Sequence, residues 1–121
     1  MKFLVLALLT LVPSLAHAET VPTRISYLNC TGYQPGVGSV TFIYTGKDFN
    51  ITEVSAFGVP FSQQAEVVSV QALSSNKLVF NLRGRVLGID YKLVVNSAGE
   101  SRAYSGENSM QVVCAGDIRG L

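Results

Sequence analysis

The sequence contains no tryptophan, a single histidine and two cysteines, and only 14% of its residues are charged. The one histidine, His17, lies close to the N-terminus, in a segment that we expect to be removed on export. Histidine is the side chain that most often serves general acid–base catalysis. Two thiolates without a histidine leave a zinc ion short of ligands. We therefore expect a protein that is not an enzyme and that has no metal site and no cofactor.

The sequence also lacks a large excess of charge of one sign. Lysine and arginine number 9 against 8 aspartates and glutamates, and loss of Lys2 with the N-terminal segment would balance the two. Proteins that bind nucleic acid carry clustered lysine and arginine, because neutralising phosphates drives that binding. We expect no nucleic acid among the partners of this chain.

No apolar run reaches the roughly 20 residues that a membrane-spanning helix needs. The one shorter run, 3–12, follows Lys2 and precedes the small-x-small sequence Ala-His-Ala at 16–18. This order is typical of a cleavable secretory signal peptide. We predict a signal peptide at 1–18 and a single exported domain at 19–121, periplasmic or secreted, with no membrane span after cleavage.

The two cysteines, Cys30 and Cys114, lie near opposite ends of the expected mature chain. In an oxidising compartment an even pair of this kind predicts a disulfide. Leu28 and Val112 share the strand faces of the two cysteines under period-two alternation. We therefore expect the bond to tie the first strand to the last and to face the core.

Apolar and polar residues alternate with period two along most of the mature chain, which predicts β-strands. The clearest strands are expected at 39–45, 77–83, 90–96 and 109–114, and weaker ones at 24–30, 51–57 and 65–73. Gly-bearing or polar turns separate them. The expected core faces are Val40, Phe42, Tyr44, Leu78, Phe80, Leu82, Tyr91, Leu93, Val95, Met110, Val112 and Cys114. The pattern indicates an all-β domain, either a sandwich or a small barrel.

Four segments together resemble the IPT/TIG domain, which is an immunoglobulin-like module. They are the Gly/Pro-rich turn at 32–38, the Val-Thr-Phe-Ile element with Gly46 and Phe49 at 40–49, the segment ending in Gly-Val-Pro at 54–60, and the Tyr-x-Leu-x-Val-x-Asn segment at 91–99. The resemblance implies a binding or structural-spacing role without catalytic residues. We therefore predict a single immunoglobulin-like β-sandwich of about seven strands, with one disulfide.

A second arrangement is similar to small periplasmic lysozyme inhibitors of the membrane-bound type. It consists of the Tyr-Leu-Asn-Cys sequence at 27–30, the late Cys114, and the Ser-Arg-Ala-Tyr sequence at 101–104. It implies an inhibitor of a hydrolase such as lysozyme, with Arg102 and Tyr104 on a protruding loop. A small carbohydrate-binding module is a third alternative, in which exposed aromatic rings such as Tyr33 and Tyr104 would stack on sugars.

Each of the clearest strands also carries an apolar residue on the face opposite its core set. These residues are Ile43, Val79, Val94 and Val113. A strand with one solvated face normally shows polar residues there, and an exposed apolar patch marks a partner site. We therefore predict a face for a protein partner or for self-association. The favoured function is an exported, non-catalytic binding or structural module of the cell envelope or the extracellular space.

Overall fold

The structure, a computed structural model, describes residues 25–118; the predicted signal peptide at 1–18 lies outside this range. Eight β-strands make up the fold, and no helix within residues 25–118 could cross a membrane. The strands are β1 (Ile25–Gln34), β2 (Gly38–Tyr44), β3 (Phe49–Ser55), β4 (Pro60–Ser74), β5 (Lys77–Gly84), β6 (Asp90–Asn96), β7 (Ser101–Ser105) and β8 (Asn108–Ile118).

The eight strands form one closed antiparallel barrel in which each strand pairs with its neighbours in the sequence. The predicted immunoglobulin-like sandwich is therefore wrong. Period-two alternation predicts which face of a strand is buried, but it is the same in a sandwich and in a barrel. Pairing of β1 with β8, from Ile25 opposite Ile118 to Thr31 opposite Val113, closes the sheet. Closure leaves no free sheet edge at the seam.

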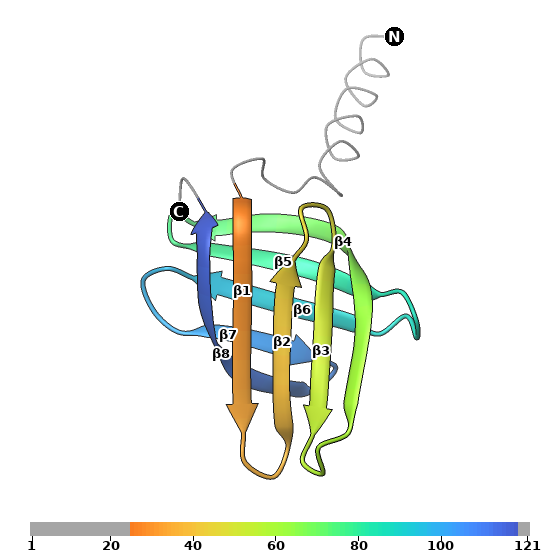
Figure 1. Ribbon diagram of the computed structural model, residues 1–121. Coiled ribbons are helices and arrows are strands. Elements are labelled where there is room, and N and C mark those ends of the chain that lie inside the picture. Colours follow the sequence, from red (N-terminus) through yellow and green to blue (C-terminus); the bar gives the residue numbers. More distant parts are fainter. Residues whose placement is uncertain (1–24, 119–121) are drawn as a thin grey trace, which may run out of the picture.

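The barrel is flattened, with β1, β2 and β3 in front and β5, β6 and β7 crossing behind them (Figure 1). β4 and β8 bend from one layer into the other. Register shifts interrupt the pairing of β4 with β5 between Val67 and Ser69 and between Ala72 and Ser74. Shifts of this kind bend a strand and increase its twist, which lets the 15-residue β4 turn the corner.

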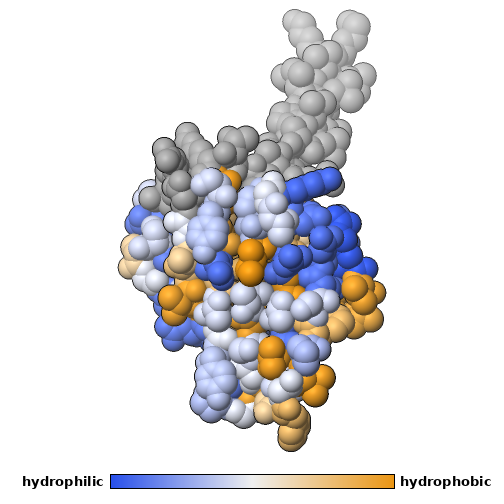
Figure 2. All heavy atoms as spheres, in the orientation of Figure 1, coloured by the Kyte–Doolittle hydropathy of each residue, from blue (hydrophilic) through white to orange (hydrophobic). Residues whose placement is uncertain are grey.

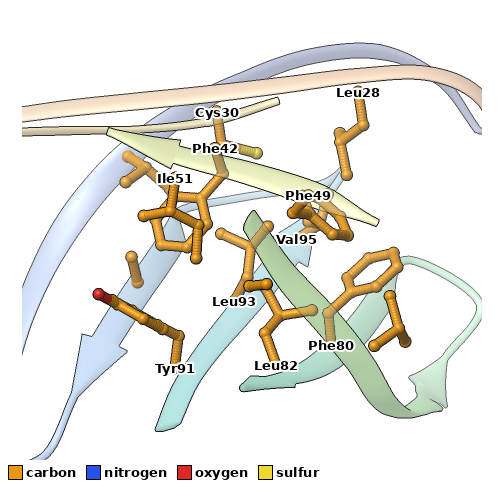
Figure 3. Packing of buried hydrophobic residues seen from close by; sticks show 14 of the residues in the cluster. Leu28, Cys30, Phe42, Phe49, Ile51, Phe80, Leu82, Tyr91, Leu93 and Val95 are labelled. Atoms are coloured by element: carbon orange, nitrogen blue, oxygen red, sulfur yellow. The ribbon is translucent and has the colours of Figure 1, made fainter. Parts of the chain in front are cut away.

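The core fills the middle of the barrel (Figure 3). Three phenylalanines, Phe42, Phe49 and Phe80, are each no more than 1% exposed, and the rings of Phe49 and Phe80 meet edge to face at 5.4 Å. Burial of a side chain of this size contributes roughly 1.5–3 kcal/mol. All twelve residues predicted to face the core belong to this cluster or pack against it, so the predicted strand phases are confirmed.

The short strand β7, Ser101–Ser105, was not among the seven expected strands. Its sequence, Ser-Arg-Ala-Tyr-Ser, has one small apolar residue, Ala103, on its inner face and therefore carries almost no hydrophobic alternation. Only its pairing with β6 and β8 defines it as a strand.

Candidate functional site

The two ends of the barrel differ in chemistry. At one end, which we call the mouth, lie the connections β1–β2, β3–β4, β5–β6 and β7–β8, each with a glycine of positive φ. The first three of them expose large apolar side chains: Val37, Phe57, Val59, Val86 and Leu87. The connections at the opposite end are mostly polar, as in Lys47, Asp48 and Asn76. Figure 2 shows apolar residues at the lower end and right edge, where the mouth connections lie.

A cavity of about 540 Å³ opens at the mouth. We call it the mouth cavity. Its lining residues are Gln34, Val37, Gly38, Ser39, Val40, Phe42, Glu53, Val54, Ser55, Val59, Phe61, Tyr91, Ala103, Tyr104, Ser105, Asn108, Ser109 and Met110. They come from β1, β2, β3, β4, β6, β7 and β8, so the cavity is open to solvent on one side and surrounded by strands on the others.

A chain of three hydrogen-bonded side chains, two of which line the cavity, lies next to it. The Tyr91 hydroxyl donates to Glu53 Oε2 at 2.7 Å and accepts from Gln63 Nε2 at 3.0 Å. Gln63 Oε1 in turn accepts from the backbone N–H of Val86 at 3.1 Å. β3, β4, β6 and the β5–β6 connection are thus joined by one network. Networks of this kind hold their members in a fixed geometry when every buried group is satisfied.

The environment of Tyr91 keeps its hydroxyl protonated. Burial of the ring, together with the hydrogen bond to Glu53 and the charge on it, raises the pKa of Tyr91 to about 12. The ring of Phe42 meets that of Tyr91 edge to face at 6.0 Å. In Figure 3 the hydroxyl oxygen of Tyr91 points away from the apolar cluster. Tyr91 therefore joins the core to the mouth cavity and presents a permanent hydrogen-bond donor to Glu53.

Gly84, on β5, makes room for the Gln63 amide. A Cβ at Gly84 would overlap the Oε1, Cδ and Nε2 atoms of Gln63. Gln63 is only 6% exposed, and movement of its amide away from an added Cβ would disturb its hydrogen bonds to Tyr91 and Val86. The lack of a side chain at Gly84 therefore leaves the space in which the Gln63 amide makes its hydrogen bonds.

A second hollow, of about 390 Å³, lies toward the opposite end of the barrel. Its lining includes Leu28, Val95, Glu100 and Val113. Glu100 forms an ion pair with Arg102 at 2.6 Å, with both side chains substantially exposed to solvent. This hollow lacks a buried polar network comparable to that of the mouth cavity.

The predicted disulfide is confirmed. Cys30 and Cys114 are bonded and lie directly opposite each other across β1 and β8. Cys30 is fully buried, and Cys114 packs against the core. The bond joins the first strand to the last, as expected, but it does so at the closing seam of a barrel.

The four residues of the predicted partner face do not form one patch. Val79 and Val94 are paired across β5 and β6, but Val79 is only 6% exposed. Ile43 on β2 and Val113 on β8 are exposed, and β1 lies between their strands. Arg102 on β7 is paired with Val94 and separates it from β8. A common face requires the four strands to be neighbours, whereas β1 lies between β2 and β8, and β7 lies between β6 and β8.

Arg102 and Tyr104 lie on strand β7, so the predicted protruding loop at these residues is wrong. Arg102 donates to Glu100 and to Ser109 Oγ, at 2.9 Å for the latter. The Lys92 ammonium lies 5.7 Å from the centre of the Tyr104 ring. Both side chains are thus engaged by neighbours on the barrel wall. Tyr33, the other aromatic considered for sugar stacking, is 71% exposed on β1.

Sequence reasoning did not identify Glu53 and Gln63 as site residues, although a signal for both was present. Glu53 follows Phe49 and Ile51 at the inward phase of β3, and Gln63 precedes Ala65 at the inward phase of β4. A polar residue at a core phase needs a hydrogen-bond partner inside the protein. That partner, Tyr91, was assigned to the core alone.

Within residues 25–118, no group of three or more histidine, cysteine, aspartate or glutamate side chains could hold a metal ion. Comparison with known proteins adds no assignment: no protein family, no curated protein and no solved structure matches this chain.

Proposed function

We propose that this protein is an exported, non-catalytic binding protein and that its ligand binds in the mouth cavity. The observation that carries the proposal is the cavity itself, of about 540 Å³, whose wall exposes more apolar than polar surface and includes the hydrogen-bonded pair of Glu53 and Tyr91. Small-molecule sites are typically concave, measure about 300–1,000 Å³ and combine apolar walls with a few well-placed polar groups. Eight-stranded barrels are wide enough to hold one small ligand.

The chemistry of the cavity supports binding over catalysis. Its titratable side chains are Glu53, Tyr91 and Tyr104. General acid–base catalysis is most efficient when the pKa of the catalytic group lies near the working pH, whereas the pKa of Tyr91 is raised to about 12. Tyr91 and Glu53 are already hydrogen-bonded to each other in an arrangement that fixes their positions. Export is supported by the Cys30–Cys114 disulfide, since such bonds persist in oxidising compartments.

Blocking the cavity tests the proposal. Ser105 is half-buried and lines the cavity, so Ser105→Phe should fill part of it while the pairing of β7 is kept. Ser75, in the exposed β4–β5 turn at the opposite end, provides the matched control Ser75→Phe. Binding of n-octylamine, 1-octanol and octanoate would be followed by two-dimensional amide NMR of the mature protein.

We expect at least one of these probes to shift the amide signals of cavity residues in the wild type and in Ser75→Phe. Ser105→Phe should lower the affinity for that probe by about tenfold or more, because the added ring occupies the part of the cavity that the probe would fill. A probe that binds elsewhere on the barrel, or that binds Ser105→Phe as well as the wild type, would contradict the proposal. Dispersion of the amide spectrum in each variant confirms that the fold is kept.

A further inference from the structure

The mouth cavity contains a single charged side chain, the carboxylate of Glu53. The ion pairs within residues 25–118 join Arg83 to Asp90, Arg85 to Asp48 and Arg102 to Glu100, so none of them involves Glu53. The negative charge of Glu53 is therefore not balanced by a cationic side chain in the cavity. A bound cation would balance it, and the attraction between the two charges is stronger beside apolar walls than in water.

The hydrogen bonds of the network fix which part of the carboxylate is available. Tyr91 donates to Oε2 of Glu53, and Gln63 donates to the Tyr91 hydroxyl, so the phenol cannot turn its proton elsewhere without breaking the chain. Among residues 25–118, the hydrogen bond to the Glu53 carboxylate is the one from Tyr91 to Oε2, and Oε1 has none. Because Glu53 lines the cavity, Oε1 can accept from a donor bound there, and an ammonium group is such a donor.

The walls around Glu53 suit an apolar body attached to that ammonium. Phe42 and Val40 are buried beneath the cavity, while Phe61 is 36% exposed and Val59 is 63% exposed nearer the rim. Val37 on the β1–β2 connection, which is 56% exposed, extends the apolar surface outward. The cavity thus combines one carboxylate with apolar side chains both at its base and toward its opening, where the polar residues Ser55 and Asn108 also line it.

We propose, on the basis of the binding function above, that the mouth cavity selects cationic amphiphiles: molecules with an amine or ammonium head that pairs with Glu53 and an apolar tail that lies along Val40, Phe61 and Val59. Neutral molecules with the same tail keep the apolar contacts and lose the ion pair. Anionic molecules place a second negative charge against Glu53, which costs affinity.

Three straight-chain probes of eight carbon atoms with different heads test this selection: n-octylammonium chloride, 1-octanol and sodium octanoate, in which the carboxyl carbon is one of the eight. Affinities would be measured by isothermal titration calorimetry on the mature protein, at neutral pH and below the micelle concentration of each probe. The variant is Glu53→Gln, in which the amide oxygen still accepts from Tyr91. The matched control is Glu107→Gln, since Glu107 is exposed on the β7–β8 turn at the same end of the barrel but does not line the cavity.

We expect the ammonium probe to bind the wild type about ten- to a hundredfold more tightly than 1-octanol, the range for a charge-assisted hydrogen bond, and octanoate to bind most weakly. Glu53→Gln should remove this preference, and Glu107→Gln should keep it. Equal binding of all three probes in the cavity, or a preference that survives Glu53→Gln, overturns the cationic selection and leaves the proposed binding function standing. If none of the probes binds in the cavity, both proposals fail.

Discussion

Cys30 and Cys114 are paired residues of adjacent strands, so their disulfide lies across the seam where β8 meets β1 and the barrel closes. The bond spans 84 residues of sequence, which encloses most of the described chain in one loop. In the unfolded chain such a crosslink removes more conformational freedom than any local contact can. In the folded chain it adds a covalent tie to a seam that backbone hydrogen bonds already hold.

The disulfide should therefore contribute to stability and have little effect on topology. We expect the double variant Cys30→Ser/Cys114→Ser to lose about 2–5 kcal/mol of unfolding free energy, the usual range for a small secreted domain. Urea titration followed by circular dichroism measures the loss, with unreduced wild type as reference. Thiol labelling of the denatured, unreduced wild type should find no free cysteine. Labelling at both positions would contradict the bond, and an unchanged urea midpoint would contradict its contribution.

Gly84→Ala should destabilise the protein through Gln63. The added Cβ overlaps the Gln63 amide, and displacement of that amide breaks its hydrogen bonds to Tyr91 and Val86. Leaving buried polar groups unsatisfied costs about 1–3 kcal/mol. Urea titration would compare Gly84→Ala with Gly99→Ala, because Gly99 lies in an exposed turn where only the Asn96 side chain comes near an added Cβ.

Gln63→Ala removes the obstacle and so provides the decisive comparison for Gly84. The cost of Gly84→Ala should be much smaller in the Gln63→Ala background than in the wild type, because the three atoms nearest to the new Cβ all belong to the Gln63 amide. Additive effects of the two substitutions would show that Gly84 acts independently of the network.

The raised pKa of Tyr91 predicts a loss of stability at high pH. The unfolded chain ionises this tyrosine near its ordinary pKa of 10.0, whereas the folded chain holds the proton until about 12. The stabilisation is therefore fully present below pH 10 and is lost as the pH rises through 12. Thermal unfolding of the wild type and of Tyr91→Phe at several pH values between 10 and 12 measures this loss of stability.

The difference in stability between wild type and Tyr91→Phe should shrink as the pH rises over this interval. Burial and the charge of Asp48 also raise the pKa of Tyr44. Tyr44 therefore adds a pH dependence of stability with the same sign, and this dependence is present in both the wild type and Tyr91→Phe. A difference that stays constant with pH would mean that Tyr91 ionises as freely in the folded chain as in the unfolded one. Tyrosinate absorbance of the native protein gives an independent measurement of the same pKa.

Processing of the N-terminus is open to a direct check, since residues 1–18 lie outside the described part of the chain. If the protein is produced in bacteria with its own leader, we expect the exported form to begin at Glu19, after the small-x-small site. Intact mass spectrometry of the periplasmic fraction or the culture medium would show this. An exported protein that retains residues 1–18 would contradict the predicted cleavage.

The sequence by itself determined the inward faces of the four clearest strands, although Val79, on the opposite face of β5, is buried as well. Alternation along 39–45, 77–83, 90–96 and 109–114 was sufficient to predict the inward faces of four strands, since burial of apolar surface is a local pattern with period two. The sequence was also sufficient for the Cys30–Cys114 bond, because two cysteines allow only one pairing within the chain. The strand β7 was not predicted, because its residues show almost no alternation of apolar and polar side chains.

Only the tertiary structure decided what the alternating strands build. A sandwich and a barrel differ in whether the last strand pairs with the first, and that pairing depends on backbone hydrogen bonds between β1 and β8 that no local pattern records. The same is true of the candidate site. Tyr91 is 38 residues from Glu53 and 28 from Gln63 in the sequence, and the curved sheet brings its hydroxyl within 3.0 Å of a polar atom of each. A polar residue at an inward position signals that a partner must exist, but only the fold determines which residue that partner is.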